Sequence, residues 1–166
     1  MIRLLMMASA LSLSSCARNQ SDAAGDGSSR SAASTPAITL ERTACFGSCA
    51  VYTLSIHPTG EVLFEGRANV LKVGMASGRV SPERVERLLS ELDRGGYFGF
   101  ADRYTSPEPT CGRYATDLPS AITSVTLQGR SKRIVHDYGC GGAPGALLVL
   151  ERRIDEAVNS GQWTGR

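Results

Sequence analysis

The 166-residue sequence lacks a long hydrophobic run. Its apolar N-terminal segment, residues 4–13, is shorter than the roughly 20 residues that a membrane-spanning helix needs, and no second such run follows. An excess of charge of either sign is also missing, since 18 Lys and Arg stand against 16 Asp and Glu. Nucleic-acid-binding proteins need a basic face that neutralises phosphates. We therefore expect no membrane-spanning helix and no nucleic-acid partner.

The common nucleotide, zinc-protease and esterase motifs are missing as well. The sequence contains no Gly-x-Gly-x-x-Gly, no P-loop and no His-Glu-x-x-His, and no serine lies in a Gly-x-Ser-x-Gly turn. His136 and Asp137 are neighbours in an expected strand, where successive side chains point to opposite faces. We therefore expect no cofactor, no metal and no catalytic residues, and a non-enzymatic function is favoured.

The first sixteen residues carry the clearest pattern that is present. A basic residue, Arg3, precedes the short apolar segment 4–13, and Leu13-Ser14-Ser15-Cys16 follows it. This arrangement is similar to the signal peptide and lipobox of bacterial lipoproteins. The resemblance implies that residues 1–15 are removed, that Cys16 is lipidated, and that the lipid chains anchor the protein to a membrane. It further implies a cell-envelope location, with the outer membrane facing the periplasm favoured because alanine follows the cysteine.

The rest of the chain is expected to be a tether and one domain. Residues 16–36 are rich in Ala, Ser, Gly and Asp without apolar periodicity, which predicts a disordered tether. Residues 37–166 are enough for a single domain with its own core. Four cysteines remain after Cys16, and in an oxidising compartment they predict two disulfides with three pairings open. These cysteines are Cys45, Cys49, Cys111 and Cys140.

Hydrophobic periodicity predicts an α+β fold. Strands are expected at residues 38–43, 51–56, 61–66, 69–80, 122–127 and 132–138. A helix that begins at Ser81 follows the fourth strand, and a second helix begins at Pro144. The predicted order is β-β-β-β-α-β-β-α, a mainly antiparallel sheet of about five to six strands with the helices on one face. A long loop, residues 101–120, separates the halves.

Several segments together resemble a family of exported bacterial domains of unknown function. The shared elements are CFGSCAVYTLSI, EVLFEGRANV, SPERVERLLSEL, YATDLPS, KRIVHDYG and LERRIDEAV, which span roughly residues 38–163. The family has no established activity, so the resemblance implies a fold and an envelope location. Because the family pattern holds only the CFGxC cysteines, the resemblance also implies pairing of Cys45 with Cys49 and of Cys111 with Cys140.

A binding surface is expected beside the long loop. We predict that the domain binds or inhibits another envelope protein without catalysing a reaction. The candidate contact residues are Tyr104, Tyr114, Asp117, Asp137 and Tyr138.

The Cys45–Cys49 pair supports an alternative function. Two thiolates in a Cys-x-x-x-Cys spacing suit copper(I) or thiol redox chemistry. The surrounding hairpin pattern differs from the βαβ context of thioredoxin-like proteins, and a structural disulfide that fixes a sharp turn is the simpler interpretation.

Overall fold

The computed structural model describes residues 35–165. The predicted signal peptide, the lipidation site Cys16 and nearly all of the predicted tether lie outside these residues. Among the helices of residues 35–165, none combines the length and the apolar character that crossing a bilayer requires.

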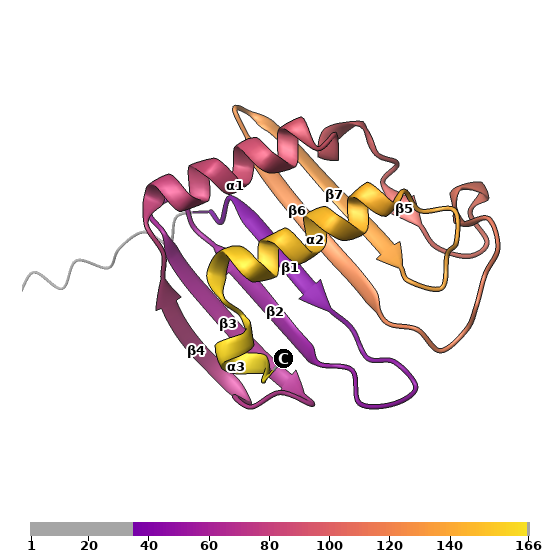
Figure 1. The fold of residues 1–166 in the computed structure, drawn as a ribbon, viewed down its shortest axis with the longest axis horizontal. Helices are drawn as coiled ribbons and strands as arrows, with labels where there is room; N and C mark the ends of the chain where they lie inside the picture. Colours follow the sequence, from indigo (N-terminus) through magenta and orange to yellow (C-terminus); the bar gives the residue numbers. More distant parts are fainter. Residues whose placement is uncertain (1–34, 166) are drawn as a thin grey trace, which may run out of the picture. The chain divides into compact units, whose positions relative to one another are not determined.

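The domain is built on one seven-stranded sheet (Figure 1). The strand order is β4-β3-β2-β1-β6-β7-β5, and every neighbouring pair is antiparallel except the parallel pair β5 and β7. The strands are β1 (Ile38–Arg42), β2 (Val51–Ile56), β3 (Glu61–Ala68), β4 (Gly74–Arg79), β5 (Arg103–Tyr104), β6 (Ser120–Leu127) and β7 (Arg130–Asp137).

Alternating side chains give the sheet one buried face. Tyr52, Leu54 and Ile56 of β2 are buried, and the residues between them are only half-buried. The register of β1 on β2 places Leu40 opposite Leu54 and Ile38 opposite Ile56. A shift of one residue would turn this apolar set toward solvent, so burial fixes the register.

Helices cover the buried face. Helix α1 (Pro82–Arg94) begins where the Ser81 hydroxyl accepts the N–H of Arg84 at 3.3 Å. Helix α2 (Gly145–Val158) lies across the same face of the sheet as α1 (Figure 1). The short helix α3 (Gly161–Thr164) then covers β3. The sheet and these helices form the two layers of an α+β domain.

Aromatic stacking closes the core at the β4 side. The indole of Trp163 stacks on Phe64 with the ring centroids 5.1 Å apart. Gly78 of β4 lies against the same indole, where an added Cβ would come within 3.0 Å of it. The tryptophan therefore closes the core against a part of the sheet where glycine leaves room for the ring.

The structure corrects the predicted strand number and order. The sheet has seven strands rather than five to six, because β5 lies within residues 101–120 that were predicted to be loop. That segment also contains a 3-10 turn, η2 (Pro109–Cys111), and another, η1 (Tyr97–Gly99), precedes it. The fourth strand is shorter than predicted, and the chain continues into α3 beyond the predicted last helix.

Candidate functional site

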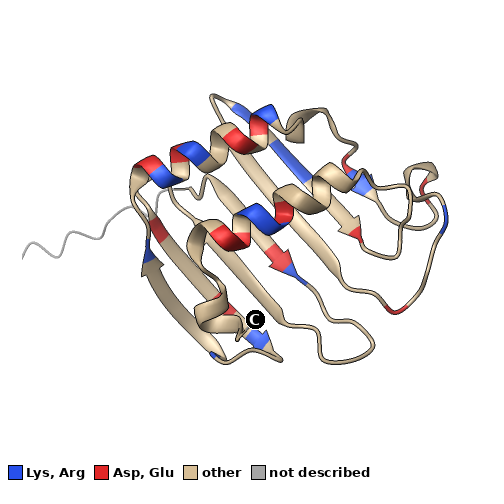
Figure 2. Cartoon of the chain, viewed as in Figure 1, with Lys and Arg blue, Asp and Glu red and all other residues tan. Residues whose placement is uncertain are grey.

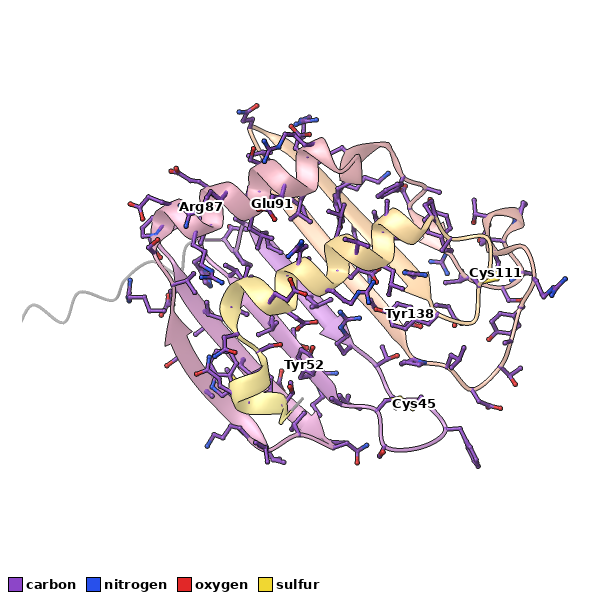
Figure 3. The ribbon with its side chains drawn as sticks, in the orientation of Figure 1. Cys45, Tyr52, Arg87, Glu91, Cys111 and Tyr138 are labelled. Atoms are coloured by element: carbon purple, nitrogen blue, oxygen red, sulfur yellow. A yellow bond between two sulfur atoms is a disulfide. The ribbon has the colours of Figure 1, made fainter. Side chains whose placement is uncertain are left out.

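Two disulfides fasten the loops at one end of the sheet. This end, called the stapled end below, comprises segments 43–50, 105–119 and 138–144, where β1 and β7 finish and β2 and β6 begin. The structure joins Cys45 to Cys49 and Cys111 to Cys140, the pairing that the family resemblance implies. The first bond closes a small ring, and the second holds the long loop to the segment after β7 (Figure 3).

Apolar side chains are exposed at the stapled end. Phe46, within the small ring, is 90% exposed, and its N–H donates to the carbonyl of Asp117 at 3.1 Å. Leu118 and Tyr114 of the long loop are 49% and 44% exposed. The two loops are thus bonded to each other and present three large apolar side chains. We call Phe46, Tyr114 and Leu118 the loop surface.

Two predicted contact residues, Asp117 and Asp137, lie beside the loop surface, to which a third, Tyr114, belongs. The hydroxyl of Tyr114 donates to Asp137 Oδ2 at 3.3 Å, and the N–H of Gly139 donates to Asp137 Oδ1 at 2.8 Å. The negative charge of Asp137 is the main cause of the raised pKa of Tyr114, and the charge of Asp117 adds to it. Asp117 itself adopts a left-handed backbone conformation with φ of 71°. The structure therefore brings Tyr114, Asp117 and Asp137 together.

The remaining two predicted contact residues lie elsewhere. Tyr104 is 5% exposed in β5, and its hydroxyl accepts the N–H of Ala101 at 3.0 Å, so it is a core residue rather than a partner contact. Tyr138 follows Asp137 and therefore points to the opposite, helix-covered face of the sheet. The five predicted contact residues therefore do not form one surface.

A partly buried polar network lies between the sheet and α2. Arg42 of β1 forms an ion pair with Asp155 of α2 at 2.8 Å. Tyr52 and Ser160 donate to the other oxygen of the same carboxylate at 2.6 and 2.8 Å. Burial alone would lower the pKa of Arg42, but the charge of Asp155 and the neighbouring tyrosines raise it above its ordinary value. Asp155 therefore holds α2 onto β1 and β2.

Glu151 forms the second half of this network. It is 1% exposed, and its Oε1 accepts from His136 Nδ1 at 2.8 Å. The Tyr138 hydroxyl donates to Oε2 at 2.8 Å and in turn accepts from Arg42. Burial is the main cause of the raised pKa of Tyr138. The carboxylate therefore fixes which nitrogen of His136 carries its inward proton.

The sequence contained one signal for this network. Glu151 and Asp155 are spaced four residues apart on the apolar stripe of α2, between Leu147, Ile154 and other buried positions. Two acidic residues on the buried side of a helix need partners, because an unpaired buried charge is costly. Most of their partners lie on or beside β1, β2 and β7, far away in the sequence, and no local pattern identifies them.

Two hollows accompany these features. One, of about 270 Å³, lies at the start of α2 and includes His136 and Tyr138 in its lining. The other, of about 250 Å³, lies between α1 and α2, where Arg87 and Glu91 are labelled in Figure 3. Acidic and basic residues alternate along both helices (Figure 2), so this groove carries no patch of one sign.

Within residues 35–165, no three His, Cys, Asp or Glu side chains cluster as metal ligands would.

A family model described as "Domain of unknown function (DUF6438)" matches residues 36–158. The chain belongs to the DUF6438 family. The matched residues contain both disulfides, the loop surface, His136, Glu151 and Asp155. Ser160 and α3 lie beyond the part that the DUF6438 model matches. No curated protein matches the chain.

Proposed function

We propose that this DUF6438 domain is the non-catalytic binding module of a lipid-anchored envelope protein, and that it contacts a protein partner through the loop surface. The observation that carries the proposal is the 90% exposure of Phe46 on a disulfide-closed ring. Large apolar side chains that are exposed together commonly indicate a binding site.

The stapled loops favour tight binding because they are ordered in advance. The Cys45–Cys49 bond restrains the ring, and the Phe46 N–H bond to Asp117 ties the ring to the long loop. Ordering a loop on binding consumes part of the interaction free energy, and a loop that is already ordered avoids that loss. Exposed aromatic side chains on such loops are typical of residues that dominate interfaces.

The position of the loop surface fits an anchored protein. The chain enters the domain at Ala37, immediately before β1, and the loop surface lies at the other end of β1. An anchor at Cys16 would attach through this entry point. The loop surface would then be at the end of the domain away from the attachment.

Site-specific crosslinking tests the binding proposal. With p-benzoyl-phenylalanine at position 46, the full chain in its native cells should give one discrete crosslinked protein after irradiation. The same probe at exposed Val149 of α2 serves as the control and should give none. Phe46→Ala should compete poorly for the partner while its free energy of unfolding stays within about 0.5 kcal/mol of wild type, since Phe46 is exposed. Identical products from both positions would contradict the proposal.

Two further measurements test the anchor and the alternative. Radiolabelled palmitate should be incorporated into the wild-type chain and not into Cys16→Ser. The thiol redox and copper(I) alternative requires the Cys45–Cys49 disulfide to open near roughly −200 mV, whereas a structural disulfide opens only below about −300 mV. Alkylation at defined potentials distinguishes the two, and an opening near the first value would replace the binding proposal by the redox one.

A further inference from the structure

The two outer strands of the sheet differ in how they are protected. Strand β5 has two residues, and the segment that follows it is held by the Cys111–Cys140 disulfide. Strand β4 has six residues and lies at the outer left of the sheet (Figure 1). In the part of the chain that the structure describes, it pairs with β3 alone. Proteins usually protect an outer strand with proline, lysine or a bulge, and β4 contains none of these.

The hydrogen-bond pattern shows which main-chain groups of β4 face outward. The N–H of Val80 donates to the carbonyl of Gly60 at 2.9 Å, so this pair and every second pair that precedes Val80 along β4 are hydrogen-bonded pairs of β3 and β4. The even-numbered residues of β4 therefore direct their N–H and C=O groups to β3. Met75, Ser77 and Arg79 direct theirs away from the sheet.

We propose that β4 pairs antiparallel with β4 of a second copy of this chain, across a two-fold axis at Ser77. In this register Ser77 lies opposite Ser77 of the other copy, and Met75 lies opposite Arg79. Each of the three outward residues donates one main-chain bond and accepts one, so the pairing uses every outward group of the strand. The same surface serves both copies, as a two-fold interface requires.

The side chains of β4 suit this register. Met75, Ser77 and Arg79 are exposed on the face of the sheet opposite the helices, and Arg79 there lies beside the uncharged Met75 of the other copy. Like charges therefore do not face each other across the interface. On the helix-covered face Ala76 lies opposite Gly78, and these small residues let the strands approach.

Charges at the two ends of β4 are complementary between copies. Lys72 lies just before β4 and Glu83 just after it, and both are exposed. Antiparallel pairing brings the start of one strand to the end of the other, so Lys72 of each copy lies near Glu83 of the other. The exposed apolar residues Leu71 and Val73 flank Lys72 and approach the second copy with it. This complementarity favours a second copy over a strand of another protein.

The interface contains no residue of the loop surface, so it is independent of the proposed partner contact. Failure of one proposal leaves the other intact.

Disulfide trapping of the full chain in its native cells tests the register. Cα atoms of a hydrogen-bonded antiparallel pair are about 5.5 Å apart, within the range that a disulfide bridges. After oxidation with copper phenanthroline, Ser77→Cys should therefore run as a covalent dimer on a non-reducing gel. The matched control is Arg79→Cys on the same strand, whose two copies lie roughly 14 Å apart in this register. That variant and the wild-type chain should stay monomeric on the gel.

A charge exchange at the two-fold axis identifies the partner as a second copy. In cells that express two differently tagged full chains, copurification of the tags should fall about fivefold when both copies carry Ser77→Lys, and likewise when both carry Ser77→Glu, because like charges then lie opposite each other. One copy of each variant should restore it, since the pair becomes Lys opposite Glu. Ser77 is exposed, so these changes should leave the domain folded, with both native disulfides resistant to alkylation.

Three outcomes would overturn the inference. The first is that Ser77→Cys gives no covalent dimer. The second is that Arg79→Cys gives as much dimer as Ser77→Cys, which would indicate random collision. The third is that the mixed Lys and Glu pair copurifies no better than the pairs of like charge. A crosslink from Ser77→Cys to a different protein would assign the β4 edge to that protein instead.

Discussion

At the scale of single residues, Glu151 is the buried charge on which the α2 interface depends. It is 1% exposed and accepts from both His136 and Tyr138. Glu151→Leu leaves those two donors without their acceptor, and we expect the free energy of unfolding to fall by about 3 kcal/mol or more. Urea unfolding followed by circular dichroism measures this loss.

The matched control for that prediction is on the same helix. Glu156 is exposed, and within residues 35–165 its carboxylate forms an ion pair with exposed Arg153 alone, so Glu156→Leu should change the free energy of unfolding by about 0.5 kcal/mol or less. If both leucine variants lost the same stability, helix propensity rather than the buried network would explain the effect.

At the scale of elements, the two disulfides should contribute unequally to stability. Cys111–Cys140 spans 29 positions, whereas Cys45–Cys49 spans 4. The loop-entropy relation gives about 3.6 kcal/mol for the longer span and about 1.9 kcal/mol for the shorter. We expect the double alanine variant of Cys111 and Cys140 to lose more stability in thermal and urea unfolding than that of Cys45 and Cys49. The opposite ranking would show that the small ring restrains more of the fold than its length indicates.

The elements also show how far the sequence predicts the fold. The hairpin at Gly60 and the helix at Ser81 were predictable because their signals are local: a glycine with φ of 84°, a capping serine and a proline after it. Strand β5 was missed because two residues, Arg103 and Tyr104, cannot show an alternating pattern. Its parallel pairing with β7 depends on contacts far apart in the sequence.

The candidate sites were predictable to a smaller extent for the same reason. Of the predicted contact residues, Tyr114 and Asp137 are bonded to each other. The contacts of His136 with Glu151 come from a strand and a helix separated by 15 positions. Periodicity shows that such a helix position is buried, but it does not show which residues its side chain contacts.

At the scale of the whole molecule, three tyrosines packed in or against the core make stability depend on alkaline pH. Burial is the main cause of the raised pKa values of Tyr52, Tyr97 and Tyr138. In the unfolded chain a tyrosine loses its proton near pH 10, while in the folded chain these three retain it. Their contribution is therefore complete below about pH 10 and is lost as pH rises toward the folded pKa values, by up to roughly 1.4 kcal/mol per pH unit for each tyrosine.

Two measurements check this dependence. Absorbance at 295 nm should show that these three of the five tyrosines ionise in the folded protein well above the ordinary value, and urea unfolding should show stability falling between pH 10 and 11. Tyr97→Phe keeps the core ring and removes the hydroxyl that bonds Thr123 at 2.7 Å. That variant should lose about a third of the pH dependence, because one of three equivalent groups no longer titrates. A single ionisation step near pH 10 for all five tyrosines, with the chain still folded, would show that the three hydroxyls are open to solvent. The polar network beneath α2 would then be more hydrated than the core that surrounds it.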